Sequence, residues 1–483
     1  MAHLGIDMGT SAVKVCVTDD AGAVVATSEG PLTSQHPFTG ASEQAPDAWI
    51  AALGVAMAGL PAGLRETIKV IGLSGQMHGA VTLDESRKPL RPAILWNDGR
   101  AVAECAAMAA AVPDIGHITG VPPMPGFTAP KLLWLSHHEP EVHARIAHVL
   151  LPKDYVGLYL HGNLATDPSD AAGTSWFDQH SGQWSQALCD ASATDIAWLP
   201  PVLAGHAVAG HLGADAALAL GLPQGIPVAT GAGDGAAGAV GIGAVAPGDG
   251  FISLGTSGQV FVTTKTCEPN PERRTHAYAH TLPGLWFQMA AMLNGARPMA
   301  WLAALLQRPI ADLLEEAATA TPGPLFLPYL SGERTPHGDN DIRAGFWGLS
   351  ETTTQGTMMR AVVEAIAFTF ADAQAAMAAG GAKPDRLLAI GGGTRSDFLL
   401  QMIADVIQVP LGRSDAAEVG PALGAARLGQ MALGAAPSHV ATKPEVSRWF
   451  TPDPARAAEL APRLAGYRAL YPALKAVGAA VDA

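Results

Sequence analysis

The stretch "LGIDMGTSAVKV" (residues 4–15) recurs in the second half of the chain as "FISLGTSGQVFV" (residues 251–262). Each copy has a short apolar strand, then Gly-Thr-Ser, then a second strand in which apolar and polar residues alternate. The copies lie about half the chain apart, a spacing typical of a duplicated domain and too long for a solenoid repeat. The sequence therefore predicts two related α/β domains, residues 1–245 and 246–483.

The turns of the two predicted hairpins can bind phosphate. A tight Gly-Thr-Ser turn leaves backbone N–H groups and hydroxyls pointing outward, where they can meet phosphate oxygens. For one copy alone, an ordinary hairpin with small turn residues is the alternative. Two copies facing each other across a cleft would hold a nucleotide, with Thr10 and Ser11 on one side and Gly255 and Thr256 on the other. Asp7 ends the first strand, where the second copy has Ser, and can hold Mg²⁺ among phosphate and water oxygens.

The densest glycine cluster is "GAGDGAAGAVGIG" (residues 231–243), which follows an apolar strand. Asp234 lies between two glycines, so another molecule can closely approach the backbone there. A carboxylate in this position, just before a helix, can accept a proton from a substrate hydroxyl. The alternative is an aspartate that only caps the helix. The flanking glycines and the second hairpin that follows favour the catalytic interpretation.

A third glycine cluster, "GGGT" (residues 391–394), lies between a predicted strand and a helix capped by Ser396. The adenosine part of a nucleotide could lie on this loop, against Gly392 and Gly393. A plain strand–helix turn is the alternative. The loop has neither the P-loop pattern nor the dinucleotide-binding pattern.

Two polar segments, "SGQMHGA" (residues 74–80) and "LWNDGR" (residues 95–100), end apolar strands. They combine hydrogen-bonding side chains with an aromatic wall, which suits a polyhydroxy ligand. Any one of these residues could be purely structural, but their clustering favours a sugar site. The candidates are Gln76, Met77, His78, Trp96 and Asp98.

Composition excludes several classes of partner. The chain has 483 residues, of which 48% are hydrophobic, and a formal net charge of -14, which argues against nucleic acid and acidic membrane surfaces. Its four cysteines are scattered without metal-ligand spacing, as expected of a reduced protein without zinc. We see no signal peptide and no apolar run long enough to span a membrane, so we expect a cytoplasmic location.

The double hairpin resembles the ATPase superfamily of actin, Hsp70 chaperones and hexokinase, which implies two ribonuclease-H-like domains flanking a nucleotide and sugar cleft. Within it, the chain is similar to the FGGY carbohydrate kinases over nearly its whole length. "GFTAPKLLWL" (residues 126–135) resembles the first family signature, and "AGFWGL" (residues 344–349) with "RAVVEAIAF" (residues 360–368) resembles the second. The segments "GQMHGA", "RPAILWNDGR", "LLPKDY", "DPSDAAGT" and "LPYLSGERTPH" resemble the branch that phosphorylates D-xylulose.

This resemblance implies ATP and Mg²⁺ as cofactors and D-xylulose as the sugar, phosphorylated on its C5 hydroxyl. It implies that Asp234 is the proton acceptor, that Asp7 holds Mg²⁺, and that Met77 and His78 contact the sugar. It also implies that Gly255-Thr256 and Gly392-Gly393 line the nucleotide. One departure concerns Gly235, where the family often has Asn; any sugar contact from that Asn is missing in this chain.

Three other functions are also compatible with these sequence patterns. The first is a kinase of the same family for L-ribulose, ribitol or glycerol. The second is a chaperone- or filament-like ATPase, for which the polar residues at 76–78 and 96–100 have no evident use. The third is a sugar-sensing repressor, which the lack of a preceding helix-turn-helix disfavours. The oligomeric state is open, with a homodimer as one option.

Overall fold

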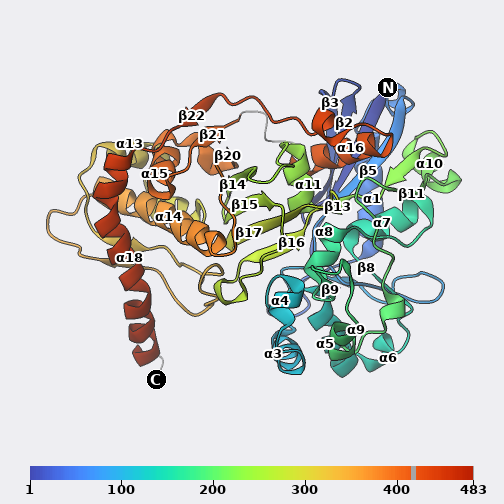
Figure 1. The fold of residues 1–483 in the computed structure, drawn as a ribbon, viewed down its shortest axis with the longest axis horizontal. Coiled ribbons are helices and arrows are strands. Elements are labelled where there is room, and N and C mark those ends of the chain that lie inside the picture. Colours follow the sequence, from blue (N-terminus) through green and yellow to red (C-terminus); the bar gives the residue numbers. More distant parts are fainter. Residues whose placement is uncertain (415–419, 482–483) are drawn as a thin grey trace.

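The two Gly-Thr-Ser stretches are the turns of two hairpins, one in the main sheet of each of the two lobes (Figure 1). The computed structural model describes residues 1–414 and 420–481. The hairpins and their neighbours consist of β1 (Ala2–Met8), β2 (Ala12–Asp19), β5 (Ile68–Gly75), β14 (Gly250–Leu254), β15 (Gly258–Thr264) and β20 (Leu387–Ile390). β1 pairs antiparallel with β2 and parallel with β5, and β14 pairs in the same way with β15 and β20. The predicted duplication is therefore present in the strand pairing.

Further strands extend each sheet to seven. They are β3 (Val24–Pro31), β11 (Val208–His211), β12 (Pro227–Ala229) and β13 (Ala232–Gly233) in the first sheet, and β16 (His276–Ala279), β17 (Trp286–Met292), β21 (Leu411–Arg413) and β22 (Arg448–Phe450) in the second. The first sheet has the order β11-β12-β5-β1-β2-β3, with β13 paired to β5, and the second has the order β16-β17-β15-β14-β20-β21-β22. Every residue of β1 is buried, as expected of a central strand covered on both faces.

Short strand pairs lie outside the two sheets. They are β4 (Glu43–Gln44) with β7 (Ala93–Ile94), β6 (Val81–Leu83) with β8 (His148–Leu150), β9 (Phe177–Asp178) with β10 (Gln183–Trp184), and β18 (Leu325–Leu327) with β19 (Gly345–Trp347).

Helices surround both sheets, and the part of the chain that the structure describes also has four short 3-10 helices, labelled η. In the first half of the chain they are α1 (Pro46–Ala58), α2 (Ala62–Arg65), α3 (Val102–Ala111), α4 (Ile115–Thr119), α5 (Thr128–His138), α6 (Pro140–His143), α7 (Pro152–His161), α8 (Pro168–Ala171), η1 (Ala172–Thr174), α9 (Gln186–Ala191), η2 (Ile196–Trp198), α10 (Ala214–Leu220) and α11 (Asp234–Gly241). In the second half they are η3 (Pro271–Arg273), α12 (Arg297–Leu305), α13 (Ile310–Thr319), α14 (Gln355–Ala378), η4 (Gly392–Arg395), α15 (Asp397–Ile407), α16 (Gly420–Ala432), α17 (Pro437–Val440) and α18 (Pro454–Val481).

Two helices link the lobes. α16 belongs to the second half of the sequence, yet it packs on the first sheet so closely that a Cβ added to Gly5 would lie 1.9 Å from the carbonyl oxygen of Ala422. α11 comes from the first half and shares a core cluster with Phe261 of the second sheet. The lobes therefore exchange helices across the boundary predicted after residue 245, and that division into domains remains a prediction.

α14 is the core helix of the second lobe. By length and composition it is the one helix among the described residues that could cross a membrane, but 78% of its most apolar stretch is buried inside the protein. It packs in a core cluster with residues of β14, β15, α12, α13, α15 and α18. Burial within the lobe therefore accounts for its apolar sequence.

Candidate active site

Asp7 lies near the end of β1, between Lys14 of β2 and Ser74 of β5. It is only 8% exposed, and the Ser74 hydroxyl donates a hydrogen bond of 2.9 Å to its Oδ1. Burial is the main cause that raises the pKa of Asp7 to about 6, while Ser74 and Lys14 act in the opposite direction. The carboxylate is therefore ionised at pH 7 at a cost that a bound cation would relieve.

Asp234 is the first residue of α11, and Gly233 occupies the N-cap position. The alternative prediction that Asp234 caps this helix is therefore wrong; its Oδ1 accepts the N–H of the adjacent Gly235 at 2.8 Å. The side chain is exposed to solvent. Desolvation by the surrounding protein raises the pKa of Asp234 to about 7, and the negative charge of Asp7 raises it further; contact with solvent weakens both effects.

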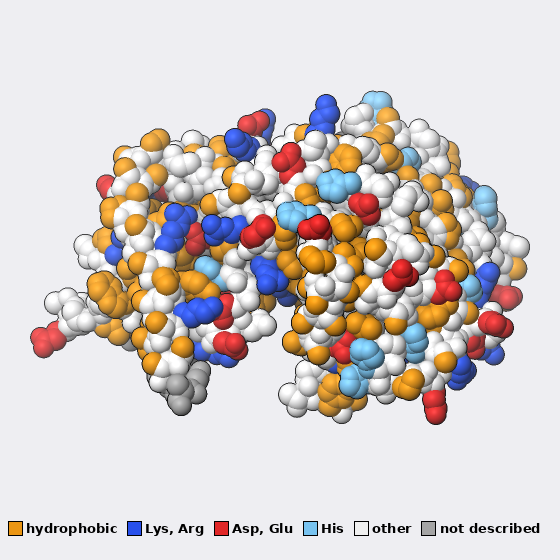
Figure 2. Space-filling view, turned by 60° about the horizontal axis from the view of Figure 1, so that its bottom comes forward, with side chains coloured by type: hydrophobic (Ala, Val, Ile, Leu, Met, Phe, Trp, Pro, Cys, Tyr) orange, Lys and Arg blue, Asp and Glu red, His pale blue; other side chains and the backbone are white. Residues whose placement is uncertain are grey.

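The mutual repulsion of these two carboxylates fits a shared cation. Among residues 1–414 and 420–481, no group of three or more His, Cys, Asp or Glu side chains could hold a metal by itself. A Mg²⁺ here would therefore take its remaining ligands from phosphate groups and water, as this ion commonly does. Figure 2 shows that the surface is hollowed between the two lobes.

Thr10 connects the first Gly-Thr-Ser turn to the predicted sugar site. Its hydroxyl donates to Oε1 of Gln76 at 3.0 Å and accepts from Nε1 of Trp96 at 2.9 Å. Gln76 also contacts Gln44 at 3.3 Å, so its amide is fixed in place. The structure thus brings Thr10, Gln76 and Trp96 together, while Ser11 at the tip of the turn is exposed.

His78 and Met77 lie where β5 ends, close to Asp234. Nδ1 of His78 contacts the carbonyl oxygen of Gly173 at 2.6 Å, and its ring stacks on Phe127 with centroids 4.4 Å apart. Because a carbonyl can only accept, Nδ1 carries the proton. Burial lowers the pKa of His78 to about 3, so the ring is neutral and its Nε2 is an acceptor. Met77 packs against Gly233, the residue before Asp234.

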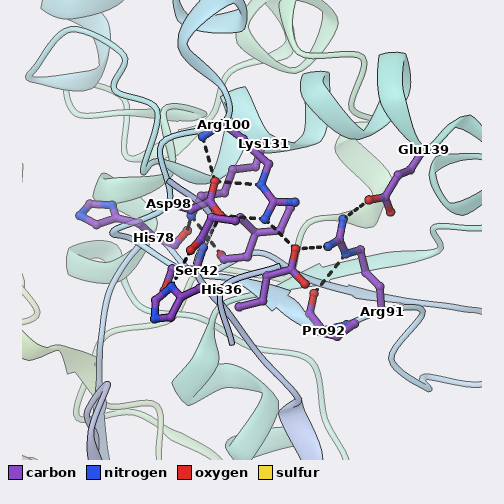
Figure 3. A network of polar contacts seen from close by, with 12 residues as sticks. His36, Ser42, His78, Arg91, Pro92, Asp98, Arg100, Lys131 and Glu139 are labelled. Carbon is purple, nitrogen blue, oxygen red and sulfur yellow. Dashed lines mark hydrogen bonds and ion pairs between the residues drawn. The ribbon is translucent and has the colours of Figure 1, made fainter. Parts of the chain in front are cut away.

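Asp98 belongs to a buried network rather than to an open surface (Figure 3). Arg100 donates to both of its oxygens at 2.8 Å, and the N–H of Ser42 donates to Oδ2 at 2.7 Å. Lys131 lies nearby and donates to the carbonyl oxygen of His78 at 2.9 Å. Both oxygens of Asp98 thus have partners within the protein, and a contact between Asp98 and sugar remains a prediction.

The two predicted nucleotide segments of the second lobe are adjacent. Gly255 and Thr256 form the turn after β14, and their carbonyl oxygens accept the N–H groups of Ala296 at 2.8 Å and Gly295 at 3.1 Å. The loop with Gly392 and Gly393 follows β20, the parallel neighbour of β14. A Cβ on Gly393 would lie 2.9 Å from the side chain of Leu254, so this loop borders the turn.

Sequence reasoning missed a buried charge cluster beneath Asp234. Nζ of Lys153 lies 2.5 Å from Asp154, 3.1 Å from Asp167 and 3.4 Å from Asp170, and none of the four side chains is more than 1% exposed. These residues belong to "LLPKDY" and "DPSDAAGT", two of the segments that resemble the family. Charged residues inside an otherwise apolar segment were the available signal.

Comparison with known families decides which class of enzyme has this site. The model of the N-terminal domain of the FGGY family of carbohydrate kinases matches residues 2–241, and that of the C-terminal domain matches residues 250–433. The chain belongs to the FGGY family of carbohydrate kinases. FGGY kinases use ATP, so this protein is an ATP-dependent sugar kinase, and the interpretation as a chaperone-like ATPase or a repressor is wrong.

Its FGGY relatives match almost from end to end. The chain is 41% identical to a xylulose kinase of Escherichia coli (strain K12), over 97% of this chain and 98% of the relative. It is 42% identical to a xylulose kinase of Klebsiella pneumoniae, over 89% of this chain and 90% of the relative. A crystal structure titled "xyloylose kinase" from Brucella ovis superimposes with a TM-score of 0.95 at 41% identity, covering 99% of this chain and 100% of the other. The predicted actin-like fold with two sheet-containing domains is confirmed.

Proposed function

We propose that this chain transfers the γ-phosphoryl group of ATP to the C5 hydroxyl of D-xylulose, with Mg²⁺ as the required ion. The observation that carries the proposal is the place of Asp234, an exposed carboxylate at the first residue of α11, next to Gly233, which packs against Met77. Relatives that bear the name xylulose kinase and match nearly the whole chain support D-xylulose over other sugars.

Asp234 acts as the proton acceptor for the sugar hydroxyl. A general base is most effective when its pKa is near the working pH, and burial brings Asp234 into that range. Phosphoryl transfer needs little other covalent help from the protein, because it depends mainly on alignment and on stabilising charge. The site therefore needs only one base, provided that both substrates are held in line.

The sugar is oriented by the residues around the end of β5. His78 accepts a hydrogen bond from a sugar hydroxyl through Nε2, since Gly173 occupies the other ring nitrogen. Trp96 is 42% exposed and gives an aromatic wall, and Gln76 is the polar group beside it. Met77 closes the apolar side next to Gly233. Asp98, two residues after Trp96, contacts the sugar directly or fixes its own loop through Arg100.

The ATP phosphates lie between the two hairpin turns. Thr10 and Ser11 face them from the first lobe, and Gly255 and Thr256 from the second, while the adenosine part lies on Gly392 and Gly393. Asp7 holds Mg²⁺, which supplies positive charge to the phosphate oxygens. We expect Asp7→Asn to weaken the Mg²⁺ dependence of turnover while calorimetric sugar binding persists; an unchanged Mg²⁺ requirement would refute this role.

Asp234→Asn tests the catalytic assignment, because it keeps the shape but removes the base. General-base catalysis is worth about 10²–10⁴-fold. We therefore expect kcat to fall by at least that order, while D-xylulose and ATP still bind in calorimetry. A kcat within a few-fold of the parent would mean that the proton acceptor lies elsewhere.

A panel of sugars tests the choice of substrate. ADP release would be measured with D-xylulose, D-ribulose, L-ribulose, ribitol and glycerol, and the highest kcat/KM is expected for D-xylulose. Another sugar in first place would keep the kinase and replace the substrate. Gly235 bears on this choice, since a Cβ there would meet no atom within 4 Å and so leaves space beside Asp234. A cytoplasmic location and a homodimer complete the proposal.

A further inference from the structure

A chain of hydrogen bonds leads from the buried charge cluster to the start of α11. The N–H of Gly233 donates to Oγ of Ser169 at 3.1 Å. The Ser169 hydroxyl in turn donates to Oδ2 of Asp167 at 2.5 Å, and the N–H of Ser169 donates to the same oxygen at 2.9 Å. The other oxygen of Asp167 forms an ion pair with Nζ of Lys153, 3.1 Å away, but accepts no hydrogen bond. The residue just before Asp234 is therefore anchored to a buried ammonium group.

The ammonium group at the base of this chain stays charged. Burial lowers the pKa of Lys153, but the carboxylates of Asp154, Asp167 and Asp170 raise it by more, so it remains above its usual range. Burial raises the pKa of Asp170 well above its usual value. The ammonium ion has three carboxyl neighbours and no exposure, so displacing it would weaken its attraction to all three inside the protein.

The same short segment also reaches the sugar site at its other end. Residues 167–173 begin with Asp167, run through α8 and reach Gly173 within η1. The carbonyl oxygen of Gly173 accepts the proton on Nδ1 of His78 at 2.6 Å. The segment thus contacts the residue before the proton acceptor and the imidazole of the sugar site within seven residues of sequence.

We propose that residues 167–173, anchored by Lys153, are a positioning segment for catalysis. The segment fixes the carboxylate of Asp234 at the distance and angle from the His78 ring that the sugar hydroxyl needs. This inference rests on the proposed function, in which Asp234 accepts the proton and His78 orients the sugar. Lys153, Asp167 and Ser169 touch neither substrate, so they act through these two residues.

We expect a large effect on kcat because the rate depends strongly on how the reacting groups are aligned. A displacement of a reacting group by about 1 Å can cost roughly 10²-fold in rate. Without the Ser169 hydroxyl, the N–H of Gly233 loses its partner and the first turn of α11 is free to shift. The sugar still binds through His78 and Trp96, and the nucleotide still binds in the second lobe. Loss of positioning should therefore appear in kcat rather than in the KM for ATP.

Ser169→Ala is the first test, because it removes the hydroxyl and leaves the volume nearly unchanged. We expect kcat to fall roughly 10- to 100-fold, with the KM for ATP within a few-fold of the parent. Ser192→Ala is the matched control: Ser192 is also fully buried, and its Oγ accepts the indole Nε1–H of Trp176 at 2.7 Å outside the site. The control should lose thermal stability to a similar degree but keep its kcat.

Asp167→Asn is the second variant, and it serves if Ser169→Ala does not fold. It should also lower kcat, and in the double variant the two losses should not multiply, because both changes break one chain of bonds. A Ser169→Ala or Asp167→Asn enzyme with the kcat of the Ser192→Ala control would overturn the proposal, as would fully multiplicative losses. Asp234→Asn is measured alongside: if it keeps its kcat, the proposed function fails instead, whatever Ser169 does.

Discussion

At the scale of single residues, the two acidic groups of the site are held in conditions that disfavour their charge. Desolvation raises the pKa of Asp7 to about 6 and that of Asp234 to about 7, and the charge of Asp7 also opposes ionisation of Asp234. Such groups lower the stability of the empty protein and gain from a bound cation or a transferred proton. These two carboxylates therefore suit catalysis but lower the stability of the folded protein.

Because the charge of Asp234 destabilises the folded protein, we expect Asp234→Asn to stabilise the empty enzyme in a pH-dependent way. The pKa of Asp234 is raised from 3.8 when the protein folds, so between about 4 and 7 the folded state binds more protons than the unfolded state. Stability contributed by this group is therefore present at low pH and lost as the pH rises through about 7. We expect a higher Tm for the variant than for the parent at pH 8, converging near pH 4, in EDTA without substrates.

The control for this measurement is Asp195→Asn. Asp195 is exposed and caps η2 by accepting the N–H of Ala197 at 2.9 Å. Its replacement should give no gain in Tm at pH 8. A Tm of Asp234→Asn that equals the parent at both pH values would show that the carboxylate is not destabilised in the folded protein.

A second prediction at this scale concerns the ring of His78. Its neutral state and its bond to Gly173 leave Nε2 as an acceptor for a sugar hydroxyl. His78→Ala should therefore raise the KM for the sugar by more than it raises the KM for ATP. Steady-state kinetics with each substrate varied in turn would measure this, and a selective change in the KM for ATP would move His78 out of the sugar site.

At the scale of elements, local sequence patterns predicted much of the fold. Both hairpins are present, and the predicted cap Ser396 starts α15 by accepting the N–H of Leu399 at 3.2 Å. The site was harder to predict. Nothing in the sequence said that Arg100 would take up both oxygens of Asp98 or that Ser169 would bond to Gly233, because such contacts depend on packing between distant segments.

No local sequence pattern could predict that α11 and α16 pack against each other. It brings Gly424 so close to α11 that an added Cβ would lie 1.8 Å from the carbonyl oxygen of Ala237. We expect Gly424→Ala to lower the free energy of unfolding by about 3 kcal/mol, since backbone on both sides must move. Denaturant titration would measure it, and a change below about 0.5 kcal/mol would mean that the helices separate readily.

The matched control for this crossing is Gly54→Ala in α1. A Cβ on Gly54 would meet no atom within 4 Å. Alanine costs less backbone entropy than glycine within a helix, so this variant should gain about 0.5–1 kcal/mol. The opposite signs expected at two helical glycines separate close packing from helix propensity.

At the scale of the whole molecule, hydrogen bonds and helix packing connect the two lobes along one side. β16 of the second half bonds to the first half through the N–H of Ala277 to Gly120 at 3.0 Å and the N–H of Ala279 to Gln179 at 2.8 Å. α11 and α16 cross close by (Figure 1). These contacts hold the two lobes together near β16. Among the described residues, no backbone hydrogen bond joins the two Gly-Thr-Ser turns.

This arrangement predicts that the lobes rotate about β16 and close on the substrates. Closure excludes water, which would otherwise accept the phosphoryl group in place of the sugar. Small-angle scattering should show a smaller radius of gyration with D-xylulose and a non-hydrolysable ATP analogue together than with either alone, because each hairpin turn then meets the phosphates. His78→Ala should need more sugar for the same change. A radius that is identical in the empty enzyme, with either ligand alone and with both ligands would mean that the cleft is already closed, and that water is kept out by the residues around Asp234 alone.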